Sequence, residues 1–162
     1  VGNSAHLAGE LFKSIAKIDV IHVPYKGSSP ALTDVMAGQV NYMLDTGAYG
    51  QIKGGKVRAI AVASNKRHPA LPAVPTFEEL GIKGMTMNAW YGLAAPAGTP
   101  AAVVGKLNAA VQAAFKSGDL GQRLADLGAE PRPGDAASFA AFWKSELDRY
   151  AGLVKLTGAT LD

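Results

Sequence analysis

The fold is decided by residues 22–45, which begin His22-Val23-Pro24-Tyr25-Lys26-Gly27-Ser28-Ser29-Pro30 and end Val40-Asn41-Tyr42-Met43-Leu44-Asp45. β-Branched residues before Pro24 predict a strand, which Lys26-Gly27 ends. Ser29-Pro30 predicts a helix start, because a hydroxyl can cap the first turn and proline is tolerated at the first helical position. Apolar residues at helical spacing follow, and then a second strand ends at Asp45. A strand–helix–strand unit of this kind makes its two strands parallel.

A third strand is predicted at 57–63, and the first helix opens so abruptly at Ser4 that a strand is expected before it. The chain is therefore expected to begin within a fold. Loops at 1–4, 25–29 and 45–49 would then open on one edge of a parallel sheet, the edge at which α/β proteins bind ligands. Two of these loops lead into helix N-termini, predicted to be capped by Ser4 and Ser29, where free N–H groups favour an anion. For either serine alone capping is the simpler explanation, whereas the clustering of the loops favours an anion site.

Composition excludes several classes of protein. The chain has 162 residues, of which 48% are hydrophobic and 18% charged, so it can bury a core. A net charge of +3 without a basic stripe argues against a nucleic-acid partner. The absence of cysteine excludes disulfides and thiolate metal sites, and the three histidines lack metal-ligand spacing. We therefore expect no metal and no cofactor.

The composition changes at Pro96-Ala97-Gly98-Thr99-Pro100. Beyond it we expect three helices: 100–116 capped by Thr99, 120–127 capped by Asp119, and a long one starting near Asp135. The predicted organisation is an α/β region over residues 1–95, followed by a helical region over residues 96–162.

Asp45-Thr46-Gly47 resembles an aspartic-protease active-site loop. Such an enzyme needs two close aspartates, so a dimer would have to supply the second copy. Those proteases are all-β, whereas this chain alternates strands and helices. An aspartic protease-like enzyme is nevertheless the alternative function to keep.

A set of motifs in fixed order resembles the Bug (TctC-like) solute receptors of tripartite tricarboxylate transporters. The matching stretches are Gly2-Asn3-Ser4-Ala5-His6-Leu7-Ala8-Gly9-Glu10-Leu11-Phe12, Val23-Pro24-Tyr25-Lys26-Gly27, Pro30-Ala31-Leu32-Thr33-Asp34, Leu44-Asp45, Arg58-Ala59-Ile60-Ala61-Val62, Leu71-Pro72-Ala73-Val74-Pro75-Thr76, Trp90-Tyr91-Gly92, Pro96-Ala97-Gly98-Thr99-Pro100 and Leu127-Gly128-Ala129-Glu130-Pro131. The likeness covers essentially the whole chain but only the C-terminal half of the family's length.

The resemblance implies a non-enzymatic, periplasmic, two-lobed binding protein that captures a small carboxylate or amino acid for a membrane transporter. Residues 1–95 would form the second α/β lobe, with a parallel-rich sheet, and residues 96–162 the helices that return to the first lobe. We expect an apolar face of the last helix, around Phe139 and Trp143, to be covered by the absent N-terminal half or by a second copy of the chain. A third possibility is a self-associating structural piece.

The resemblance also implies which residues bind the ligand. Gly2, Asn3, Ser4 and His6 match the family loop that grips a ligand carboxylate, with asparagine at position 3 where serine or threonine is more usual. Ala5 lies within this loop and is included in the expected site. By the resemblance, Asp45 matches an aspartate that reaches into the cleft from a strand end. Tyr25, Lys26, Gly27 and Ser28 are expected in the site because their loop is predicted to open on the same sheet edge.

Overall fold

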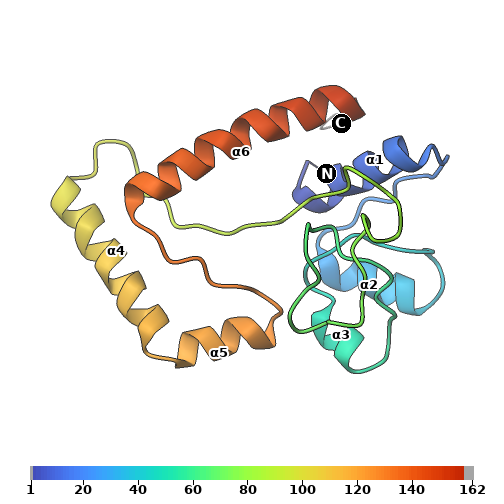
Figure 1. Cartoon of the computed structure of the whole chain (residues 1–162), viewed down its shortest axis with the longest axis horizontal. Coiled ribbons are helices and arrows are strands. Elements are labelled where there is room, and N and C mark those ends of the chain that lie inside the picture. The colour runs from blue at the N-terminus through green and yellow to red at the C-terminus, as the bar shows by residue number, and fades with distance from the viewer. Residues whose placement is uncertain (1, 159–162) are drawn as a thin grey trace. The chain divides into compact units, whose positions relative to one another are not determined.

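The computed structural model describes residues 2–158, in which the regular elements are six helices and one isolated bridge (Figure 1). The helices are α1 (Ser4–Ala16), α2 (Ser28–Met36), α3 (Tyr49–Lys53), α4 (Ala101–Lys116), α5 (Asp119–Asp126) and α6 (Ala136–Thr157). The helix-forming pattern of the sequence therefore predicted the starts of α1, α2, α4, α5 and α6 to within a few residues.

The chain divides into two compact units, and each is described by itself. Unit 1 consists of residues 1–89 together with residues 152–162, and unit 2 of residues 90–151. Helices α1 to α3 belong to unit 1, and α4 and α5 to unit 2. The predicted assignment of residues 96–162 to another lobe stays a prediction.

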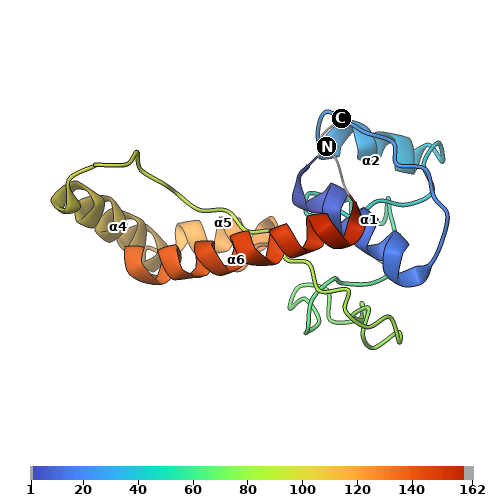
Figure 2. The same ribbon diagram turned by 90° about the horizontal axis from the view of Figure 1, so that it is seen from above.

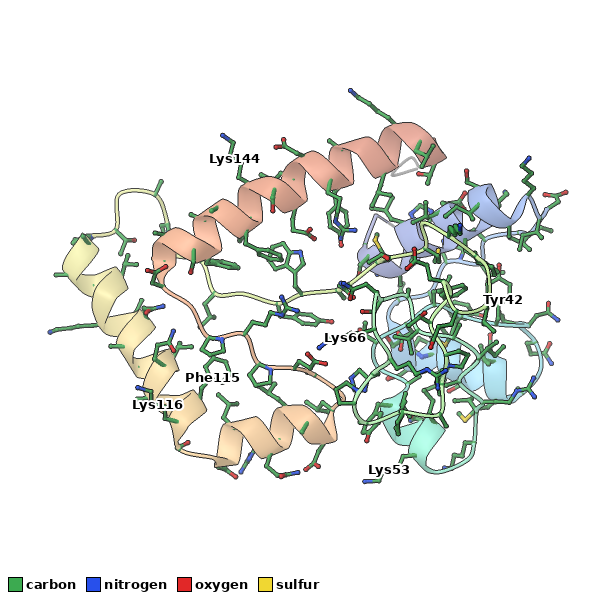
Figure 3. All side chains as sticks on the ribbon, viewed as in Figure 1. Tyr42, Lys53, Lys66, Phe115, Lys116 and Lys144 are labelled. Atoms are coloured by element: carbon green, nitrogen blue, oxygen red, sulfur yellow. The ribbon has the colours of Figure 1, made fainter. Side chains whose placement is uncertain are left out.

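The core of unit 1 is built mainly from the apolar face of α1. Leu7, Ala8 and Leu11 are buried there, together with Leu32 of α2 and the two methionines at 85 and 87. Phe12 extends this face, because its ring contacts Tyr42 edge-on at 5.9 Å and Phe77 at 5.5 Å between centroids. Tyr42 is labelled in Figure 3. Rings at this spacing add to the stabilisation that burial provides.

The predicted parallel-rich sheet is not confirmed. The segments expected to be strands at 20–24, 40–45 and 57–63 run without a ladder through the described part of unit 1, except that Val62 pairs in parallel with Thr76. Phe77 N–H donates to the Val62 carbonyl at 3.2 Å, and Val62 N–H to Pro75 at 2.8 Å. Ile21 is 91% exposed and Ile60 62% exposed. A strand needs a paired neighbour and a covered face, and these residues have neither.

The starts of α1 and α2 differ from the predicted caps, because another residue occupies the cap position of each helix. Asn3, and not Ser4, caps α1 by accepting from His6 N–H at 3.0 Å. Gly27 precedes α2 with φ of 118°, a conformation that favours glycine, so Ser29 lies inside the helix.

The two caps predicted in unit 2 are wrong for a similar reason. The Thr99 hydroxyl donates to the Pro96 carbonyl at 2.8 Å, so Pro100 occupies the cap position of α4. Asp119 is the first residue of α5 and pairs with Arg123, and Gly118 precedes it. By contrast, Asp135 accepts from Ser138 N–H at 2.7 Å and starts α6 as predicted.

In unit 2 an extended segment lies along α6, which runs as one uninterrupted helix (Figure 2). Trp90 meets Phe139, Phe142 and Trp143 edge-on, with centroids 5.3–5.9 Å apart. Its indole N–H donates to Glu146 at 3.0 Å. A side chain at Gly92 would collide with the Phe139 ring, since its Cβ would come within 2.2 Å. The apolar face expected on the last helix therefore already has one partner inside unit 2.

Glu146 is the buried charge of this packing. Arg149 donates to its carboxylate through Nε at 2.8 Å and through Nη2 at 2.9 Å. These hydrogen bonds, with a further one from Trp90, hold the pKa of Glu146 below its usual value. A buried carboxylate keeps its charge only when it is paired in this way, so the network fixes Trp90 on α6.

Candidate ligand-binding site

The first predicted loop is held by hydrogen bonds at the start of α1. Asn3 Oδ1 accepts from the backbone N–H of His6, and Gly2 N–H donates to His6 Nδ1 at 3.1 Å. Gly2 has a positive φ of 77°, which glycine adopts without strain. Gly2, Asn3 and His6 are therefore brought together as the prediction required.

The surroundings of the His6 imidazole favour its neutral form. Burial lowers its pKa below the usual 6.5, and the ring of His22, at 4.5 Å between centroids, lowers it further. Glu10 opposes these effects. Because Nδ1 accepts a hydrogen bond, the ring proton of the neutral form is on Nε2. The sequence analysis did not include His22 in the site, because the histidines lack metal-ligand spacing. No local sequence pattern indicates that the His22 ring would contact the ring of His6.

The hydrogen bonds leave donors at this end of α1. Asn3 Oδ1 accepts the capping hydrogen bond, and the two N–H bonds of the Asn3 amide are its only donors. Ser4 and Ala5 are both partly buried in the first turn, where backbone N–H groups have no helical partner. A cluster of donors at a helix start suits a carboxylate.

The second predicted loop is organised around Asp45. Ser28 Oγ donates to Asp45 Oδ1 at 2.5 Å, and Gly47 N–H donates to Asp45 Oδ2 at 2.6 Å. Tyr25 turns to a different partner, because its hydroxyl donates to Asp34 at 2.6 Å, and this bond raises the pKa of Tyr25. Lys26 and Gly27 are exposed. The sequence did not predict that Asp34 would bind Tyr25 or that Gly47 would bind Asp45, since neither spacing nor composition links these pairs.

Among residues 2–158 the contacts thus form two groups, one around His6 and one around Asp45. The prediction that both groups line a single ligand cleft stays a prediction. No set of three or more histidine, aspartate or glutamate side chains in this part of the chain could hold a metal ion. No helix within the same residues has the length and apolar character needed to cross a membrane. Lysines such as Lys53, Lys116 and Lys144 extend into solvent (Figure 3).

Comparison with known proteins gives the family. The sequence model of the family described as "Tripartite tricarboxylate transporter family receptor" (TctC) matches residues 1–159. The chain is 36% identical over 157 residues to the UPF0065 protein in the clcB-clcD intergenic region of Pseudomonas knackmussii, covering 95% of this chain and 93% of that protein. It is 34% identical over 163 residues to the protein BugT of Bordetella pertussis, covering 99% of this chain and 50% of that one. The chain belongs to the TctC/Bug receptor family.

Solved structures agree with this assignment. Rpa4515 of R. palustris with adipate matches with a TM-score of 0.88 and 35% identity, over 96% of this chain and 53% of that one. The periplasmic binding protein BugD matches with a TM-score of 0.86 and 38% identity, over 95% and 53%. MatC of Rhodopseudomonas palustris with bound malate matches with a TM-score of 0.85 and 39% identity, over 93% and 53%. The predicted likeness to periplasmic binding proteins is therefore confirmed.

The chain spans about half the length of most of these proteins, at 47% of the Pseudomonas sp. relative in the tcbD-tcbE intergenic region and 53% of Rpa4515. Members of the family are solute-binding receptors and not enzymes, so the aspartic-protease alternative built on Asp45-Thr46-Gly47 is not retained. In this chain the Asp45 carboxylate accepts hydrogen bonds from the Ser28 hydroxyl and from Gly47 N–H.

Proposed function

We propose that this chain takes part in capturing a small carboxylate or amino acid in the periplasm, as a receptor that delivers it to the membrane subunits of a tripartite tricarboxylate-type transporter. The observation that carries the proposal is the start of α1, where the Asn3 cap leaves amide N–H bonds beside the unpaired N–H groups of the first turn. Each charge-assisted hydrogen bond to a carboxylate is worth about 1.5–3 kcal/mol.

The ligand is a small carboxylate in this proposal, held at Ser4 by its hydroxyl and the neighbouring N–H groups, with Asn3 assisting. Adipate and malate in two structural neighbours support this choice of chemistry. Gly2, Ala5, His6 and the 25–28 loop complete the proposed site. A bound anion at a helix N-terminus is favoured by the helix dipole as well as by the donors.

The proposal includes a second polypeptide, because most of the relatives and solved structures compared are about twice as long as this chain. It would be either an N-terminal half of the family's fold or a second copy of this chain. Exposed apolar side chains on α6 support such a partner, and they include Phe142, Trp143 and Leu147. With one wall of a cleft supplied by a partner, affinity is weak without it.

Calorimetry with malate and adipate tests the proposal, using the chain alone and the chain mixed with an N-terminal half taken from a relative. We expect binding that strengthens in the mixture and falls roughly tenfold or more in Ser4→Ala, the loss expected for one charge-assisted hydrogen bond. Ser117→Ala, which changes a serine of unit 2 beyond the end of α4, is the matched control. A mixture that is folded and binds neither these ligands nor any other small carboxylate or amino acid contradicts the proposal.

A further inference from the structure

We infer, on the basis of the proposed function, that Asp34 of α2 is a positioning residue of the ligand site, although it lies outside the residues predicted to bind the ligand. Asp34 acts through the hydroxyl of Tyr25 and thereby fixes the loop at 25–28 against its own helix. It does not contact the ligand itself, because its partner is a side chain of that loop.

The hydroxyl of Tyr25 is engaged with Asp34 as a donor. Tyr25 Oη donates to Asp34 Oδ2 at 2.6 Å in a partly buried contact. A tyrosine hydroxyl has one hydrogen, so Tyr25 cannot donate it to a ligand carboxylate while the bond to Asp34 holds. The same bond raises the pKa of Tyr25, since ionisation of the phenol would remove the donor. Tyr25 therefore serves the proposed site through the position that it gives to the loop.

The stability of α2 by itself does not account for an aspartate at position 34. Asp34 lies in the last turn of the helix, where the negative end of the helix dipole repels a carboxylate. Aspartate is also a weak helix former. A residue that is unfavourable in its own element commonly marks a functional contact, and the contact of this side chain is with Tyr25.

The backbone of Asp34 holds the segment that leaves α2. Its carbonyl accepts from Gln39 N–H at 2.9 Å, and Gly38 turns the chain there with φ of 73°. This pattern is a Schellman motif, in which a glycine in the left-handed conformation ends the helix. One residue thus holds the segment before α2 through its side chain and the segment after α2 through its carbonyl.

Helix α2 is in turn fixed to the core and to a second loop of the proposed site. Leu32 is 4% exposed and anchors the helix in the core of unit 1. Ser28, the first residue of α2, donates to Asp45 at 2.5 Å. The loops at 25–28 and 45–47 are therefore attached to the same helix, and Asp34 is the contact that fixes the first of them.

Amide relaxation measured by NMR in the ligand-free protein tests the positioning role. We expect the order parameters at Lys26 and Gly27 to fall from about 0.85 toward about 0.6 in both Tyr25→Phe and Asp34→Ala. The double variant should be no more mobile than either single variant, because both changes remove the same hydrogen bond. Asp34→Asn should restore most of the order, since its amide oxygen can accept from the phenol.

Asp19→Ala is the matched control, because it removes an exposed aspartate of unit 1 and should leave the order parameters of the 25–28 loop unchanged. Order parameters that Asp34→Ala leaves unchanged overturn the positioning role. Effects of Tyr25→Phe and Asp34→Ala that simply add in the double variant also overturn it, because the two residues would then act independently.

Calorimetry with malate tests the part that rests on the proposed function, using the chain mixed with the N-terminal half of a relative. We expect Asp34→Ala to weaken malate binding roughly three- to tenfold, the range for one hydrogen bond, and Asp34→Asn to bind nearly as the wild type does. A loop that loses order in Asp34→Ala without any loss of malate affinity overturns the inference. If the wild-type mixture binds no small carboxylate or amino acid, the proposed function has failed, whereas the relaxation experiment still decides whether Asp34 fixes the loop.

Discussion

His6 controls the loop before α1 through both its backbone and its ring. Its backbone N–H completes the Asn3 cap, and its Nδ1 accepts from Gly2. The second contact requires the neutral ring, because a protonated imidazole has donors only. The order of this loop is therefore linked to the protonation of one side chain.

We expect the free energy of unfolding to decrease as the pH falls from about 6.5 through the lower pKa of folded His6. Burial first, and His22 next, lower that pKa, so the unfolded chain binds more protons than the folded chain in this window. Stability is then fully present above pH 6.5. Urea unfolding followed by circular dichroism at several pH values measures the effect.

His6→Gln should flatten this pH dependence, whereas His68→Gln should retain it. His68 is the control because it lies in another loop of unit 1, where its Nδ1 accepts from Ala70 N–H at 3.2 Å. The assignment to His6 is wrong if the His6→Gln chain loses stability over the same pH window as the wild type.

Residue types near the first loop were predictable from the sequence, but their pairings were not. A polar cap before α1 follows from Asn3-Ser4, yet the choice between the two depends on where the helix turns begin. The His6–His22 contact joins residues in different elements, so it depends on tertiary packing. Asp45 was predicted to bind the ligand. Its hydrogen bonds with Ser28 and Gly47 depend on the folded chain and were not predicted.

At the scale of the elements, α1 depends on its cap. We expect Asn3→Ala to lower the free energy of unfolding by about 1 kcal/mol, the usual cost of losing a capping side chain. Asn3→Ser should retain most of the stability, since serine also caps well. Thermal unfolding measured by circular dichroism provides the comparison.

Ser4→Ala separates the cap from the proposed ligand contact. Because Ser4 is the first helical residue and not the cap, its replacement should change stability by less than about 0.5 kcal/mol while weakening ligand binding. A larger loss of stability in Ser4→Ala than in Asn3→Ala contradicts this division of roles.

Helices were predictable and strands were not, for one physical reason. A helix satisfies its backbone within a single stretch, so local patterns such as that of residues 101–116 carry enough information. A strand is satisfied only by another segment, and residues 20–24 and 40–45 have apolar side chains without the required pairing. The sequence Thr76-Phe77-Glu78-Glu79 also fits a capping box, and its contacts form, since Glu79 N–H donates to Thr76 Oγ1 at 3.1 Å and Thr76 N–H to Glu79 at 2.7 Å. In the structure these contacts close a turn.

For the whole molecule, exposed apolar surface is the feature with the largest consequence. Tyr91 is 88% exposed and Leu93 80% exposed, and Leu147 is 59% exposed on α6. Surface of this kind on a folded chain favours association. We expect the sedimentation coefficient to rise with protein concentration when no partner is supplied.

Leu147→Lys should weaken this association, because it replaces exposed apolar surface with a charge. Ser145→Lys is the matched control, since it adds the same charge at an exposed position of α6 without removing apolar surface. A wild-type chain that sediments as a folded monomer at all concentrations contradicts the expectation of a partner.

The placement of both tryptophans in unit 2 has a spectroscopic consequence. Both tryptophans of the chain, Trp90 and Trp143, lie within residues 90–151, and their rings are 5.4 Å apart between centroids. Tryptophan fluorescence therefore reports on unit 2 alone, because α1 to α3 contain no tryptophan. An emission change that precedes or follows the loss of helical signal would resolve the two units as separate cooperative transitions, without any label being attached.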